Sequence, residues 1–110
     1  MSIHQKNATP LYGFSGKFAA RRGEGQTLAN ILIQAAKTMA EVNDCLLYVV
    51  SLDALNPDLV CVFETWNSKE AHDNALATPD VKALISKAMP LIDGKPEGQV
   101  LHTLGGLGLS

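Results

Sequence analysis

The segment from Leu59 to Trp66 places the tightest constraint on how this chain can fold, because it has strand character and is apolar on both faces. A strand of this kind is normally central in its sheet and covered on both sides. Glu64 is therefore expected in a site of low polarity, where an ionised carboxylate needs a partner. Alternation along the strand defines the two faces, one with Val60, Val62, Glu64 and Trp66, the other with Leu59, Cys61, Phe63 and Thr65.

A helix is predicted to begin directly after this strand. The sequence Asn67-Ser68-Lys69-Glu70 resembles a capping box, with Asn67 as the N-cap and Glu70 three residues later. His72 then falls in the second turn of that helix. We therefore expect His72 near the mouth of whatever space the face with Glu64 and Trp66 covers.

The rest of the chain supplies three more strands and two more helices. A long helix is indicated by apolar residues at helical spacing from Leu28 to Met39, and a last helix by Thr78 as N-cap with Pro79 at its first position. The turn at 56–58 joins two of the strands as a hairpin. The other strands are predicted over residues 11–20, 45–52 and 99–104.

This order of elements is that of the ferredoxin-like split βαβ, an α+β fold with a four-stranded antiparallel sheet and its helices on one face. Helices can shield only one face, yet the strands are apolar on both. The open face is therefore expected to pack on a second copy, as a homodimer. With 110 residues we expect one domain over residues 11–110, preceded by a flexible arm at 1–10.

Charge and hydropathy exclude several classes of partner. Nine Lys and Arg against 11 Asp and Glu give a net charge of -2, with no basic run for nucleic acid or an anionic membrane. No apolar run approaches the roughly 20 residues of a membrane span, and the N-terminus lacks a signal-peptide pattern. A cytoplasmic protein is expected, with Cys45 and Cys61 reduced and too far apart to pair.

No motif for metal, phosphate or nucleophilic chemistry occurs in the sequence. The three histidines, His4, His72 and His102, are dispersed and lack metal-binding spacing. Neither a Gly-x-Ser-x-Gly elbow nor a complete phosphate loop occurs. That leaves an acid/base site in an apolar cavity. The three candidate residues of this site also have purely structural interpretations. Trp66 can be a core residue, His72 a surface residue, and Glu64 one partner of a structural ion pair.

A motif that begins at Glu64 is similar to that of a known protein family. The motif Glu64-x-Trp66-x-Ser68-x-Glu70-Ala71-His72, with Thr78-Pro79 and Gly105-Gly106, resembles the antibiotic biosynthesis monooxygenases, a family of dimeric α+β barrels that includes small quinol monooxygenases. The resemblance covers about residues 11–106. Haem-degrading members use a histidine in the helix that here runs from Pro79 to Met89, where this chain has none, so haem degradation is disfavoured.

The resemblance implies oxidation of a quinol or a hydroxylated polycyclic aromatic by dioxygen as co-substrate, with no cofactor and no metal. It implies His72 as the base, with Glu64 orienting it or sharing its proton. Tyr12 would donate a hydrogen bond. The residues expected to line an apolar cavity are Trp66, Phe14, Phe18 and Tyr48.

Two other functions remain open at this point. The same dimeric barrel carries isomerases and lyases of small oxygenated metabolites, which need an acid/base pair but no dioxygen. It also carries non-catalytic dimers that bind ligands or respond to stress. The residues alone do not separate these functions.

Overall fold

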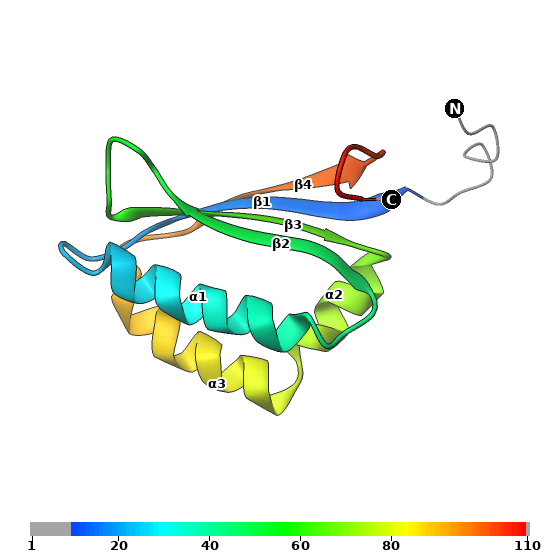
Figure 1. Ribbon diagram of the computed structural model, residues 1–110. Coiled ribbons are helices and arrows are strands. Elements are labelled where there is room, and N and C mark those ends of the chain that lie inside the picture. Colours follow the sequence, from blue (N-terminus) through cyan, green and yellow to red (C-terminus); the bar gives the residue numbers. More distant parts are fainter. Residues whose placement is uncertain (1–9, 110) are drawn as a thin grey trace.

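The computed structural model describes residues 10–109, so the arm predicted at 1–10 lies, apart from Pro10, outside the described residues. The elements follow the predicted α+β order along the chain (Figure 1). They are β1 (Leu11–Ala19), α1 (Gly25–Met39), β2 (Cys45–Leu52), β3 (Leu59–Trp66), α2 (Lys69–Leu76), α3 (Pro79–Ala88), the short 3₁₀ helix η2 (Met89–Leu91) and β4 (Glu97–Thr103).

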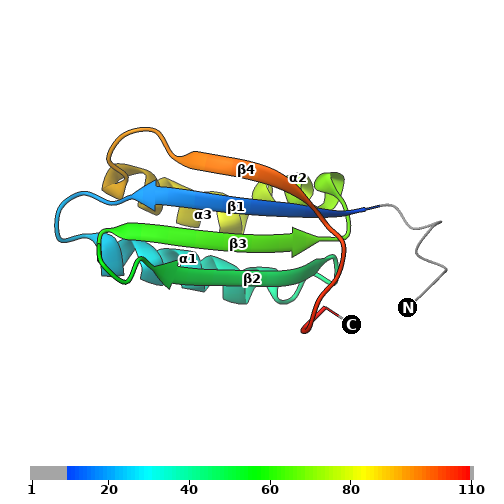
Figure 2. The ribbon, with the colours of Figure 1, turned by 90° about the horizontal axis from the view of Figure 1, so that it is seen from above.

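The four strands form one antiparallel sheet in the order β2-β3-β1-β4 (Figure 2). This is the ferredoxin-like arrangement, and it confirms that β3 is a central strand. The last strand begins earlier than predicted, at Glu97 instead of Gln99. The reason is that Glu97 and Gly98 pair with Lys17 and Gly16 of β1, and this pairing outweighs the turn character of the preceding loop.

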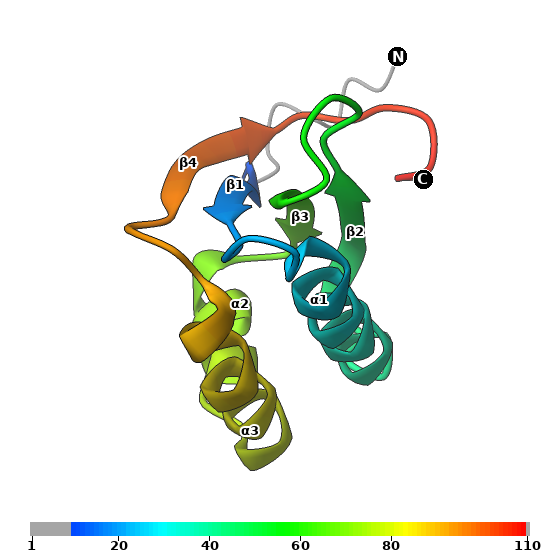
Figure 3. The same ribbon diagram turned by 90° about the vertical axis from the view of Figure 1, so that its left-hand side faces the viewer.

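The helices cover one face of the sheet and leave the other open (Figures 1 and 3). The face of β3 that carries Glu64 and Trp66 is turned toward the helices and is buried along its length. On the opposite face Leu59, Cys61 and Phe63 are only half-buried. Among the described residues, the chain after Thr103 crosses this open face near the end of β3 (Figure 2).

Two clusters of buried residues form the core between sheet and helices. The first cluster is Ala20, Leu28, Ala29, Val60 and Ala88. The second cluster is Ala35, Met39, Trp66, Ala75 and Val81. Tyr12, Cys45 and Tyr48 pack against the second cluster, which places the chemically distinctive residues at that end of the core.

The start of α2 differs from the predicted capping box by one residue. Ser68 is the N-cap, and its hydroxyl accepts a hydrogen bond of 3.0 Å from the Ala71 amide. Asn67 is unavailable for capping because its side chain donates to the Asp44 carboxylate at 3.0 Å. Glu70 therefore lies at the second helical position and does not close a box. The helix still follows β3 directly and carries His72 at the end of its first turn.

The start of α1 depends on the turn between β2 and β3. The Asp58 carboxylate accepts hydrogen bonds of 3.0 Å from the amides of Gly23 and Gly25. Gly25 lies against this turn so closely that an added Cβ would overlap the Pro57 carbonyl oxygen. The helix therefore begins where a distant carboxylate satisfies its free amides.

The cysteines are free, as predicted. The register pairs Cys61 with Ser51, whereas Cys45 lies at the other end of β2, opposite Trp66. Within residues 10–109, no helix is long and apolar enough to cross a membrane.

Candidate active site

Three neighbouring strands bring aromatic and polar side chains onto the helix-covered face. Directly paired residues of antiparallel strands share a face. The register places Trp66 between Tyr12 of β1 and Cys45 of β2. It places Glu64 between Phe14 of β1 and Tyr48 of β2. The acidic residue of the central strand is thus surrounded by apolar and aromatic groups.

His72 reaches these residues from α2. Its ring centroid lies 5.0 Å from that of Tyr12, 5.5 Å from that of Trp66 and 6.4 Å from that of Phe14. The contact with Trp66 is edge-on, at 88°. Only 13% of the His72 side chain is exposed, so the ring is held by packing and is not a free surface histidine.

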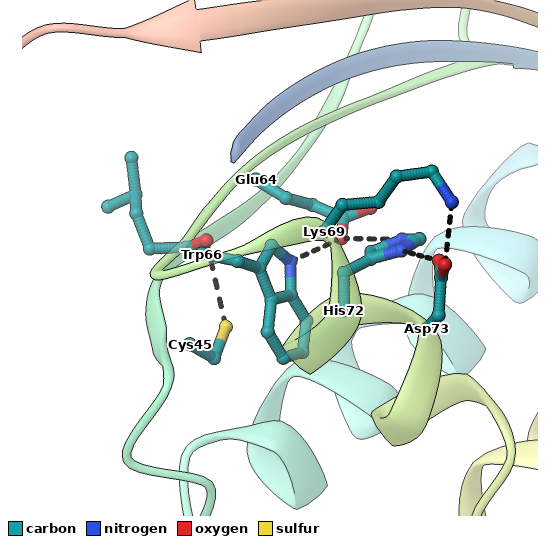
Figure 4. A network of polar contacts seen from close by, with 7 residues as sticks. Cys45, Glu64, Trp66, Lys69, His72 and Asp73 are labelled. Carbon is teal, nitrogen blue, oxygen red and sulfur yellow. Dashed lines mark hydrogen bonds and ion pairs between the residues drawn. The ribbon is translucent and has the colours of Figure 1, made fainter. Parts of the chain in front are cut away.

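Glu64 is buried and bonded to its neighbour on the same face. Its Oε1 accepts a hydrogen bond of 2.9 Å from Nε1–H of Trp66, and the residue is 7% exposed (Figure 4). Burial raises the pKa of the Glu64 carboxyl above its usual value, opposed by the Trp66 hydrogen bond and the nearby His72. The carboxyl therefore does not extend to solvent, and Lys69 is engaged elsewhere.

The same Oε1 atom faces the imidazole. It lies 3.8 Å from Nε2 of His72, which is longer than a hydrogen bond. An oxygen atom placed beside the pair can lie about 2.8 Å from both atoms, which is hydrogen-bonding distance. The pair therefore has the geometry of an acid/base site that can receive a hydroxyl group.

The other nitrogen of His72 has a polar partner that the sequence analysis missed. Nδ1 lies 2.9 Å from Oδ1 of Asp73, and Oδ2 of Asp73 accepts a hydrogen bond of 2.6 Å from Lys69 (Figure 4). The hydrogen bonds from Lys69 and His72 lower the pKa of the Asp73 carboxyl. The available signal was the His-Asp pair in a predicted helix, with Lys69 one turn earlier on the same face as Asp73.

The groups around Glu64 stay protonated at neutral pH. Burial, and then the Glu64 charge, raise the pKa of the Cys45 thiol to about 11. The same two causes raise the pKa of the Tyr48 phenol. Burial also raises the pKa of Tyr12, with Lys69 opposing this and Asp73 and Glu64 adding to it. At neutral pH these three groups are therefore donors, not bases.

Phe14 forms an apolar floor at the edge of this group. Its ring lies over two glycines, since a Cβ at Gly16 or Gly98 would come within 2.8 or 2.6 Å of ring atoms. Val100, which pairs with Phe14 from β4, is 58% exposed. The β4 side of the helix-covered face is therefore open to solvent next to an aromatic ring.

The structure brings together most of the predicted site residues. His72, Glu64, Trp66, Tyr12 and Phe14 form one group, and Tyr48 flanks Glu64 on the β2 side. A half-open pocket of about 160 Å³ lies beside Tyr48, between α1 and β2. It is lined by Ala36, Ala40, Cys45, Leu46, Leu47 and Tyr48.

Phe18 is placed apart from this group. It pairs with Val60 and packs against the first cluster, toward the other end of β1 from Tyr12. The sequence pattern put Phe18 and Phe14 on the same face of one strand, which is true. It did not show that the two rings lie over different parts of the core.

His102 also lies beside this group, although the sequence did not predict it as a site residue. It pairs with Tyr12 from β4, on the face that carries Glu64 and Trp66, and it is exposed. The predicted fold contained the necessary signal, because its last strand lies beside its first. Over residues 10–109, no three potential metal ligands converge.

An α+β ferredoxin-like domain with a buried carboxyl group beside a half-buried imidazole is the class that this fold and site define. The family model described as antibiotic biosynthesis monooxygenase matches residues 13–87. The chain therefore belongs to the antibiotic biosynthesis monooxygenase family. Among curated proteins, none matches the chain.

Solved structures support the family assignment. A protein from Chloroflexus aurantiacus J-10-fl, named provisionally as an antibiotic biosynthesis monooxygenase, is 34% identical, with a TM-score of 0.77 over 91% of this chain and 99% of that one. A similarly named protein from Caulobacter crescentus CB15 is 16% identical, with a TM-score of 0.79 over 93% of this chain and 98% of that one. The second likeness shows the fold alone.

Proposed function

We propose that this protein is a cofactor-independent monooxygenase that oxidises a quinol or another hydroxylated aromatic ring with dioxygen. Family membership supports the reaction class. The observation that carries the proposal is the 3.8 Å separation of His72 Nε2 and Glu64 Oε1 in a half-buried, aromatic-lined site. One substrate hydroxyl can reach both atoms, which is what proton removal from a phenol requires.

The first step is removal of the hydroxyl proton. Nε2 of neutral His72 accepts it, and the imidazolium that results stands next to Glu64. Burial raises the pKa of Glu64, so its carboxyl keeps a proton to a higher pH than an exposed glutamate does. When Glu64 is ionised, its carboxylate faces the imidazolium and balances the charge that His72 gains with the substrate proton.

The second requirement is a surface for the substrate ring. Phe14 and Val100 supply an apolar floor, and Tyr12 lies between His72 and β4. A planar ring laid on Phe14 brings its hydroxyl toward the His72–Glu64 pair. Tyr12, Phe14 and Trp66 surround the His72 ring, so on the side away from β4 the anion forms in surroundings of low polarity.

The deprotonated ring then supplies the electrons that reduce dioxygen. A carbon–oxygen bond forms, the oxygen–oxygen bond breaks, and one oxygen atom stays in the product. The ring loses two hydrogens, which leave with the second oxygen atom as water. The substrate is the reductant, so no further electron donor enters the balance.

We also propose that a second copy of the chain covers the open face of the sheet. Val49 is 44% exposed there, beside half-buried Phe63, and the two are paired across β2 and β3. An apolar sheet face without a second layer is a surface that a twofold dimer buries.

The test of the reaction is dioxygen uptake by the metal-stripped protein with a panel of quinols and hydroxylated polycyclic aromatics. His72→Gln should lower kcat by about a hundredfold or more, the usual contribution of a general base. Asp93→Asn, which changes an exposed loop residue, is the control and should retain uptake.

Three results would contradict the proposal. Equal dioxygen uptake by His72→Gln and the wild type would show that His72 is not the base. Turnover of an oxygenated metabolite under nitrogen would favour an isomerase or lyase. Ligand-induced thermal stabilisation without any product, across the whole panel, would favour a binding protein.

A further inference from the structure

The second polar contact of His72, on the solvent side of the ring, is not part of the acid/base pair. We propose that Asp73, held in place by Lys69, is a positioning residue that keeps the proton of neutral His72 on Nδ1 and so presents Nε2 as the base. The catalytic consequence rests on the proposed function. The placement of the proton does not depend on it.

The donors and acceptors at Nδ1 decide which ring nitrogen carries the proton. Oδ1 of Asp73 lies 2.9 Å from Nδ1, and an ionised carboxylate can only accept hydrogen bonds. Nδ1 must therefore carry the proton that makes this bond. In the neutral ring only one nitrogen is protonated, which leaves Nε2 with its lone pair toward Glu64.

Lys69 makes the Asp73 carboxylate a fixed partner. Its ammonium group lies 2.6 Å from Oδ2, one helical turn before Asp73. The His72 ring packs against Tyr12 and Trp66, and these contacts hold the plane of the ring. Lys69 thus holds the Asp73 carboxylate, and the two aromatic residues hold the His72 ring.

Asp73 orients the ring and does not take its proton. Lys69 and His72 lower the pKa of the Asp73 carboxyl, so that it stays ionised through the neutral range. The other titratable groups that face the ring are Glu64 from β3 and Tyr12 from β1. Glu64 faces Nε2 at 3.8 Å, beyond hydrogen-bonding distance, whereas Asp73 is within hydrogen-bonding distance of Nδ1, so Asp73 is the partner that favours a proton on Nδ1.

The preference is opposite to that of histidine in water, where the neutral ring favours the proton on Nε2. With the proton on Nε2, His72 would donate toward Glu64 and could not accept a proton from a substrate hydroxyl. The tautomer of the neutral His72 ring therefore decides whether Nε2 can act as the base.

Nitrogen-15 NMR of the histidine rings reads the tautomer directly, with the His72 signals assigned by their loss in His72→Gln. The pH is raised until the His72 ring is neutral. We expect Nδ1 to be protonated in the wild type and the proton to move mainly to Nε2 in Asp73→Ala. Lys69→Met should shift the balance in the same direction by a smaller amount.

Asp93→Ala is the matched control, because it removes an exposed carboxylate from a loop. It should leave the His72 signals unchanged. A wild-type ring protonated on Nε2, or an Asp73→Ala ring with the wild-type tautomer, would overturn the proposal.

Kinetics with a quinol that the wild type oxidises give the second readout. Asp73→Ala should lower kcat by about tenfold, with KM nearly unchanged, because the base is misoriented and the binding surface is intact. Unchanged kcat despite a switched tautomer would overturn the catalytic role. If the wild type oxidises no quinol, the proposed function fails, whereas the tautomer is still decided by NMR.

Discussion

The hydrogen bond from Trp66 to Glu64 should make the stability of the protein depend on pH in a way that Trp66→Phe exposes. Trp66 is 0% exposed, and its Nε1–H is a donor to Glu64 Oε1 at 2.9 Å. Because phenylalanine is smaller than tryptophan, the substitution leaves a cavity of about 40 Å³. In a rigid core this cavity lowers the free energy of unfolding by about 1 kcal/mol. The lost hydrogen bond adds about 1 kcal/mol if the acceptor is neutral, and about 2–3 kcal/mol if it is charged.

The sign of the pH dependence follows from the raised pKa of Glu64. Above the ordinary glutamate value of 4.5, the unfolded chain releases its proton while the folded protein retains it, so stability falls as pH rises toward the folded pKa. Trp66→Phe removes a donor that favours the carboxylate, which raises the folded pKa further. The variant should therefore lose more stability than the wild type as pH increases.

Urea denaturation of the wild type and of Trp66→Phe measures the difference between their free energies of unfolding. We expect Trp66→Phe to reduce the free energy of unfolding by about 2 kcal/mol near pH 4.5, and by about 3–4 kcal/mol at a higher pH at which Glu64 is ionised in the folded protein. In a Glu64→Gln background the difference between the two pH values should disappear. A loss in Trp66→Phe that is the same at both pH values would refute the reasoning.

Two further predictions concern the scaffold and the open face. Gly25→Ala should lower the unfolding free energy by about 2 kcal/mol, and Tm by roughly 10 °C, because displacing the Pro57 turn breaks the Asp58 bonds and outweighs about 1 kcal/mol of helix propensity. A Tm at or above that of the wild type would contradict this. Val49→Lys should shift a dimer to monomer in light scattering, whereas Ile33→Lys, which alters an exposed apolar residue of α1, should not. A monomeric wild type would contradict the dimer proposal.

Much of the candidate site was predictable because its members lie close together in the sequence. Glu64 and Trp66 share a strand face by simple alternation, and a capped helix directly after that strand carries His72 back over it. Asn67 shows the limit of such local reasoning. Its choice as N-cap was reasonable from the sequence, but Asp44 from another loop engages its side chain.

Contacts between distant segments could not be predicted from local pattern. The Phe14 ring lies over Gly98 because β4 pairs beside β1, and no property of either residue alone indicates this. Phe18 was grouped with Phe14 for a sound reason, since both face the helices. The packing of two separate clusters put them in different surroundings.

The sequence by itself determined the order of elements, the central position of β3 and the presence of a carboxylate, an indole and an imidazole at one end of the sheet. It could do so because periodicity and helix starts depend on neighbouring residues. Only the tertiary structure decided that Nε2 of His72 faces Glu64 across 3.8 Å while Nδ1 contacts Asp73. Those distances depend on how α2 packs against β1 and β3, which requires the whole core.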